Sequence, residues 1–99
     1  MHPAVEGYIL SLVRATRQHE MVELGASPRA SLALYRTAQA LAAIRGRGFA
    51  IPDDVKHMVV PVLGHRIMLS TRTRLRGRDN SAVLREIAEN VPVPVETMA

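Results

Sequence analysis

The stretch that decides the fold is LGASPRASLALYRTAQALAAIRG, residues 24–46. Ser27 followed by Pro28 is a typical helix start, because serine is a favoured N-cap and proline suits the first helical position. Gly46 comes just after the last apolar residue, where glycine commonly ends a helix. The sequence therefore predicts a helix over about residues 28–45. Apolar side chains surround this helix almost completely, which is typical of a central helix with neighbours on several sides.

Three further helices are expected around this one. Apolar residues at helical spacing predict the first over about residues 3–18. The third opens at Pro52, with a kink or restart at Pro61, which has no N–H for the helical ladder. The last begins within residues 79–81, where three possible caps follow one another. Residues 18–26 are expected to form a connector, and the segment after the third helix to be irregular or extended.

The composition supports one small all-α domain. The chain has 99 residues with only 3% aromatics, so its core must be aliphatic, and few stretches alternate as a strand would. It has no cysteine, which excludes disulfides and thiolate zinc sites and fits a cytoplasmic location. No apolar stretch approaches the roughly 20 residues of a membrane span, so we expect no membrane partner. We expect the domain to cover residues 1–95, with 96–99 as a tail.

Arg29 is the residue whose position calls for a function. It falls in the first turn of the predicted helix, where the helix dipole disfavours a positive charge and favours aspartate or glutamate. An arginine beside free backbone N–H groups is explained if an anion binds there, and a phosphate is the natural candidate. The alternative is a solvated surface arginine, tolerated at a cost of a few tenths of a kcal/mol.

A second cluster of charge follows the third helix. The net charge is +4, and four arginines alternate with other residues here: Arg72, Arg74, Arg76 and Arg78. They suit an acidic protein or a nucleic acid, or they form a solvated loop with their charges pointing apart. The scarcity of aromatic side chains for base stacking weighs against nucleic acid.

Other candidate chemistry is weaker. The four histidines show no ligand spacing, so no metal site is expected. Asp53 and Asp54 are interpreted as capping and dipole groups rather than a catalytic carboxylate pair. Met58 and Met68 are expected in the core. The single lysine, Lys56, has no glycines before it, so this chain carries no phosphate-binding P-loop.

Several runs resemble one family. Residues 25–34, GASPRASLAL, resemble the sensor-2 region of MoxR-type AAA+ ATPases. Residues 45–55, RGRGFAIPDDV, and 61–67, PVLGHRI, resemble later segments of that family in the same order. Residues 8–17 resemble the helix that opens its lid. The resemblance covers residues 5–95, although the dense arginine run departs from a region where the family commonly has acidic residues.

The resemblance implies the four-helix C-terminal lid of an AAA+ ATPase, without the α/β core that carries Walker A and Walker B. Arg29 is then the sensor-2 arginine, which reaches the γ-phosphate of ATP, with Ser27 and Pro28 beside it. ATP and Mg²⁺ are held mainly by the core of the same polypeptide, so hydrolysis belongs to the parent protein and the lid alone is inactive.

The resemblance also implies neighbouring subunits in a hexameric ring and chaperone-like work, such as assembly or metalloenzyme maturation, with a von Willebrand factor A domain protein as a partner. The start at Met1 and His2 suggests a truncation point or a cloning remnant. The alternative function is a stand-alone helical interaction module that binds an acidic protein or nucleic acid through residues 72–78.

Overall fold

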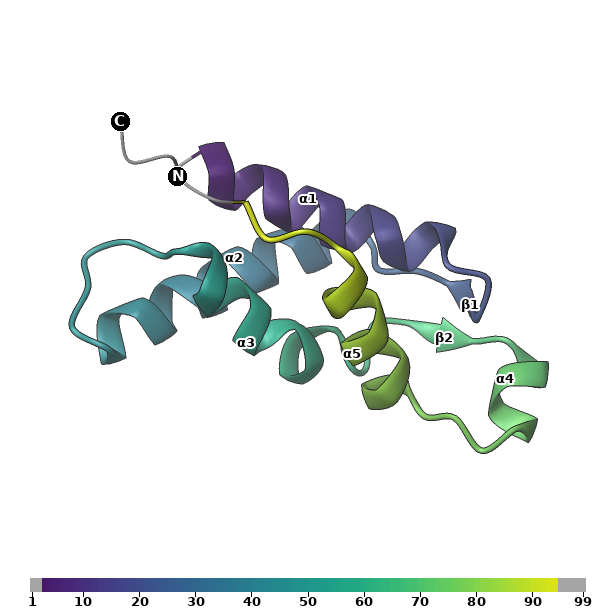
Figure 1. Ribbon diagram of the computed structural model, residues 1–99. Helices are drawn as coiled ribbons and strands as arrows, with labels where there is room; N and C mark the ends of the chain where they lie inside the picture. Colours follow the sequence, from purple (N-terminus) through teal and green to yellow (C-terminus); the bar gives the residue numbers. More distant parts are fainter. Residues whose placement is uncertain (1–2, 95–99) are drawn as a thin grey trace.

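The computed structural model describes residues 3–94, which form five α-helices and one two-stranded sheet (Figure 1). The helices are α1 (Pro3–Gln18), α2 (Pro28–Ile44), α3 (Pro52–Leu63), α4 (Thr71–Leu75) and α5 (Asn80–Asn90), and the strands are β1 (Val22–Leu24) and β2 (Met68–Leu69). The expected mainly helical fold is confirmed. The tail predicted for residues 96–99 lies outside the described residues. No helix among those described is long and apolar enough to cross a membrane.

The core lies where α1, α2, α3 and α5 meet. The α2 and α3 helices lie side by side, α1 packs on α2, and α5 packs on both α3 and α1 (Figure 1). The buried side chains are almost all aliphatic or alanine, and Tyr8 is the one buried aromatic residue in the described part of the chain. An aliphatic core is what the low aromatic content requires.

The α2 helix is less central than its composition suggests. One stripe is fully buried, formed by Ala30, Leu34, Ala38 and Ala42. On other sides Leu32 is 49% exposed and Ile44 is 82% exposed. The expectation of a helix covered on several sides is therefore wrong for this chain, because only α1 and α3 pack closely against it. Its remaining apolar surface faces solvent.

The connector and the segment after α3 pair with each other. The β1 and β2 strands run antiparallel, with Val22 opposite Leu69 and Leu24 opposite Met68. Val22 and Leu69 face the core, whereas Leu24 and Met68 are exposed. The expected placement of Met68 in the core is therefore wrong. We call β1, β2, α4 and the turn that follows α4, residues 76–78, the wing; it lies at one end of the molecule (Figure 1).

Helix boundaries follow the local chemistry. Asp79 is the cap of α5, since its carboxylate accepts a hydrogen bond from the Ala82 N–H at 2.8 Å. The α3 helix continues through Pro61 to Leu63 without a break, so the restart expected at that proline is wrong. Pro61 lies in the last turn with an exposed side chain, where the loss of one ladder bond is tolerated.

Candidate functional site

The candidate phosphate site is the N-terminus of α2. Pro28 is the first helical residue, as predicted, and Ser27 is the N-cap with extended backbone. The Ser27 hydroxyl does not cap the helix; instead, the Ser27 carbonyl accepts the Ala30 N–H at 2.9 Å. No acidic residue lies in the first turn. The dipole of this helix end is therefore not neutralised by a carboxylate of its own first turn.

The loop that leads into α2 is held against the end of α1. The Thr16 hydroxyl, itself buried, donates to the Val13 carbonyl at 2.6 Å and accepts the Ala26 N–H at 3.0 Å. The Arg17 Nε donates to the Ala26 carbonyl at 2.8 Å. Both backbone groups of the buried Ala26 are thus satisfied by α1 side chains. This bracing fixes where the first turn of α2 points.

Gly25 is required by this close approach. A Cβ atom at this position would lie 2.6 Å from the Arg17 Cα and 2.7 Å from the Arg17 backbone N. Because both are main-chain atoms, neither could move aside without shifting α1. Glycine therefore allows the loop to lie directly on the helix.

A shallow concavity of about 470 Å³ opens beside the loop. Arg17, Arg66 and Ser27 contribute polar groups to its wall, and Glu23 adds one carboxylate. The Arg66 Nε donates to the Val62 carbonyl at 3.1 Å, which holds the base of that side chain to α3. The surface next to the α2 N-terminus is therefore mainly basic.

Arg29 is exposed in the first turn of α2. Within residues 3–94 its guanidinium has no hydrogen bond or ion pair. The three predicted site residues, Ser27, Pro28 and Arg29, form one exposed corner at the start of a braced helix. Such a corner presents a positive side chain and helix N–H groups to an incoming anion.

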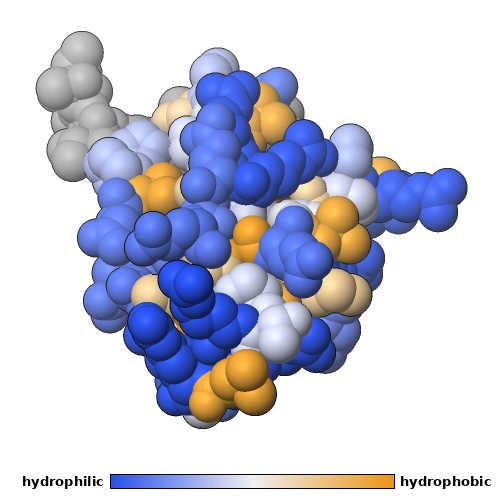
Figure 2. Space-filling model, turned by 90° about the vertical axis from the view of Figure 1, so that its right-hand side faces the viewer, coloured by the Kyte–Doolittle hydropathy of each residue, from blue (hydrophilic) through white to orange (hydrophobic). Residues whose placement is uncertain are grey.

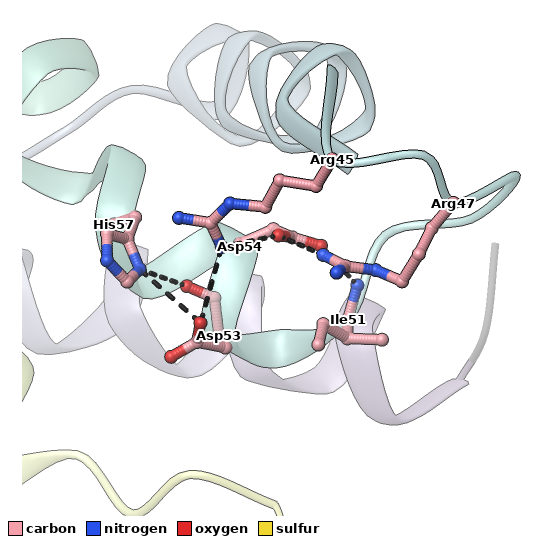
Figure 3. Close-up of polar contacts among 6 residues, drawn as sticks. All are labelled: Arg45, Arg47, Ile51, Asp53, Asp54 and His57. Atoms are coloured by element: carbon pink, nitrogen blue, oxygen red, sulfur yellow. Dashed lines mark hydrogen bonds and ion pairs between the residues drawn. The ribbon is translucent and has the colours of Figure 1, made fainter. Parts of the chain in front are cut away.

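A second polar cluster joins the end of α2 to the start of α3 (Figure 3). Asp54 is fully buried, accepts the Ile51 N–H at 2.9 Å, and pairs with Arg47 and, at 3.1 Å, with Arg45. Gly46, with φ of +82°, turns the chain between these two arginines. The interpretation of Asp54 as a capping group is confirmed, and the arginines tie the cap to the preceding helix.

Asp53, by contrast, lies on the exposed side of this cluster. Its carboxylate is 3.4 Å from Arg45 Nη1 and 3.5 Å from His57 Nδ1. The two aspartates therefore face different surroundings, and the arginines occupy the space next to the buried carboxylate (Figure 3). The cluster is built to hold two helix ends together and has no open carboxylate pair for acid–base chemistry.

The pKa of Asp54 in the cluster and that of Tyr8 in the core are both shifted. Burial alone would raise the pKa of Asp54, but the Arg47 and Ile51 hydrogen bonds and the charges of both arginines outweigh it, and the pKa falls below its ordinary value. Burial, with a smaller contribution from the Asp53 charge, raises the pKa of the Tyr8 hydroxyl. Asp54 therefore stays ionised at neutral pH and keeps its arginine partners.

The family is decided by a match to residues 14–87, which fit the family model described as the AAA lid domain. The chain belongs to the AAA lid domain family. Its relatives place it among the lids of MoxR-type AAA+ ATPases. The matched range includes the α2 N-terminus, the Arg–Asp cluster and the wing.

Individual relatives match nearly the full length of this chain. It is 42% identical to protein YeaC of Bacillus subtilis over 97% of this chain and 30% of that protein. It is 34% identical to the chaperone MoxR1 of Mycobacterium tuberculosis over 95% of this chain and 27% of that protein. A crystal structure of a candidate ATPase from Cytophaga hutchinsonii superposes with a TM-score of 0.87 at 29% identity, over 95% of this chain and 31% of that one. The chain spans less than a third of each of these relatives.

Sequence reasoning on this lid missed the brace beneath the site. Thr16 and Arg17 were visible only as the polar end of a helix, and no local pattern shows that they meet Ala26 ten and nine residues later. The resemblance of residues 8–17 to the lid-opening helix was the one available signal. Among residues 3–94, no group of three or more histidine, aspartate or glutamate side chains could hold a metal ion.

Proposed function

We propose that this chain is the nucleotide-sensing lid of a MoxR-like AAA+ ATPase and that Arg29 contacts the γ-phosphate of ATP. The observation that carries the proposal is the exposed, unpaired guanidinium of Arg29 in the first turn of a braced helix. A γ-phosphate is the anion that best explains a cation where the helix dipole favours an acid. Ser27 and Pro28 shape the approach, because they set the backbone from which Arg29 projects.

ATP and Mg²⁺ are held mainly by an α/β core of the same polypeptide, outside this chain. The lid itself spans residues 1–95 in this proposal. Its part in the chemistry is electrostatic, since a fixed guanidinium stabilises charge that develops on the transferred phosphoryl group. The lid supplies no P-loop, so it is inactive alone, and hydrolysis belongs to the parent protein.

The proposal also includes the assembly in which the parent protein works. The parent is a cytoplasmic AAA+ protein that works as a hexameric ring and serves as a chaperone for assembly or metalloenzyme maturation, with a von Willebrand factor A domain protein as a partner. The MoxR and chaperone names of its relatives support this class of work. The exposed apolar side of α2, which includes Leu32, supports packing against a further domain of the same chain.

Burial of position 29 by bound nucleotide tests the proposal. In the full-length parent with its other cysteines replaced, Arg29→Cys is expected to react with a thiol reagent about tenfold more slowly with the imido analogue AMP-PNP than with ADP, because a γ-phosphate occupies the space before it. Arg36→Cys, two turns further along the same helix, serves as the control and keeps its reactivity. Equal rates at position 29 with both nucleotides would contradict the proposal.

A further inference from the structure

The arginines of the wing are not balanced by carboxylates. Only Arg78 has a carboxylate partner among the described residues, with its Nη2 2.6 Å from Glu86 Oε2. Arg72, Arg74 and Arg76 are exposed, and in residues 3–94 their guanidinium groups make no ion pair. Four like charges within the seven residues 72–78 repel one another, and a partner of opposite charge would relieve that repulsion.

The first half of the run is helical, although the sequence predicted an irregular or extended segment: Arg72 and Arg74 lie in α4, and Arg76 is its C-cap. Ser70 caps α4 by accepting the Thr73 N–H at 3.2 Å, and its hydroxyl lies 2.7 Å from that of the buried Thr73. The Ser70 N–H also bonds to the Met21 carbonyl at 3.0 Å, next to β1. The arginines are therefore presented from a fixed element, which lowers the entropy lost when a partner binds.

A concavity of about 310 Å³ lies at the base of α4. Arg72, Arg76 and Arg78 line it together with Ser70 and Thr73, and Glu20 also lines it. Arg72 and Arg76 are one helical turn apart and so share a face. Arg78 already pairs with Glu86, whereas the guanidinium groups of Arg72 and Arg76 can receive carboxylates in bidentate geometry.

Exposed apolar side chains also belong to the wing. Leu75 is 82% exposed and Leu24 is 62% exposed, and Met68 lies exposed opposite Leu24 in the strand pair. Figure 2 views the molecule from this end and shows hydrophilic side chains around separate hydrophobic patches. The wing therefore offers positive charge and apolar area together.

We infer that the wing is a docking surface for an acidic protein segment that carries apolar side chains among its carboxylates. Charge complementarity selects the acidic residues, and Leu24, Met68 and Leu75 select a segment with apolar anchors. A nucleic acid fits less well, because the three aromatic side chains of the chain, Tyr8, Tyr35 and Phe49, all lie outside the wing.

A second copy of this chain fits less well too. The exposed carboxylates of residues 3–94 are spread over α1, α3, α5 and the wing itself, so they form no compact acidic face. The inference does not rest on the sensing role of Arg29, and it can be tested on the 99-residue chain without nucleotide.

The test is fluorescence anisotropy with a short labelled peptide of alternating glutamate and leucine. Wild-type chain is expected to bind it at low salt and more weakly at physiological salt. Changing Arg72 and Arg76 together to glutamate is expected to weaken binding at least about tenfold. The control changes Arg36 and Arg85, both exposed and outside the wing, to glutamate, so it has the same net charge as the Arg72/Arg76 variant. It is expected to bind the peptide within about threefold of wild type.

Two further binding measurements distinguish an acidic peptide from a nucleic acid as the partner. Leu24→Ser with Leu75→Ser is expected to weaken peptide binding several-fold, and a single-stranded DNA of equal charge is expected to bind less tightly than the peptide. Three outcomes would overturn the inference: no peptide binding at low salt, wild-type affinity in the Arg72/Arg76 variant, or tighter binding of the DNA.

Discussion

Replacing Arg29 with alanine in the full-length ATPase is expected to slow ATP turnover about 100-fold, the usual loss when one preorganised charge-stabilising donor is removed. The reason is that the guanidinium is the one positive side chain in the first turn of α2, and the helix end would otherwise offer only backbone N–H groups. Steady-state phosphate release at saturating ATP measures the effect. Because Arg29 is exposed, the helical circular dichroism and the unfolding midpoint of the lid are expected to remain unchanged.

The matched control for this variant is Arg36→Ala. Arg36 is also an exposed arginine of α2, but it lies about 10 Å further along the helix, too far to reach the same phosphate. Its turnover is expected to equal that of wild type. Unchanged turnover in Arg29→Ala, or an equal loss in Arg36→Ala, would reject Arg29 as the phosphate contact.

Replacing Asp54 with asparagine is expected to cost the isolated lid about 3 kcal/mol of unfolding free energy, as for other broken buried ion pairs. The substitution leaves Arg47 partly buried without its anion and weakens the acceptor for the Ile51 N–H. The α2–α3 connection depends on both contacts. Urea unfolding followed by circular dichroism measures the change. If only the stability has changed, the slope of the unfolding free energy against urea concentration stays the same.

Asp53→Asn is the control for this effect. Its carboxylate is largely exposed, so its ion pairs are screened and the loss is expected to stay below about 1 kcal/mol. The pH dependence gives a second readout. Because folding lowers the pKa of Asp54, its contribution is present at neutral pH and is lost as pH falls below the ordinary aspartate value of 3.8. Equal stability of Asp54→Asn and wild type at neutral pH would contradict this role.

Local chemistry was enough to predict the main helices. Pro28 and the cap residues at 27 and 79 mark helix starts by their own backbone preferences, and the structure has α2 and α5 begin where they indicate. Asp54 is a further example, since an acid in the first turn of a helix is favoured whatever packs around it. Signals of this kind act within three or four residues and do not depend on the rest of the fold.

The strand pair and the open side of α2 could not be predicted in this way. Val22 and Leu69 meet across 47 positions of sequence, and neither strand is long enough to show an alternating pattern. The apolar residues of α2 indicate that the helix has a large surface to bury, but they do not show whether the residues that bury it belong to this chain. Ile44, for example, is apolar and yet exposed.

The candidate site falls between these two cases. Arg29 could be singled out, because an arginine in the first helical turn conflicts with the helix dipole. Its support could not, since Thr16 and Gly25 act through contacts between α1 and the loop before α2. The sequence thus identified the charged group, and the structure added the bracing that fixes its position.

The most direct test of the central claim compares the affinities of full-length wild type and Arg29→Ala for ATPγS and for ADP. A contact to the γ-phosphate alone predicts that the variant binds ATPγS about tenfold more weakly, the loss expected for one charged hydrogen bond, and ADP with unchanged affinity. Equal affinities of both proteins for ATPγS, or the same loss for both nucleotides, would contradict the assignment of Arg29 as the sensor of the γ-phosphate.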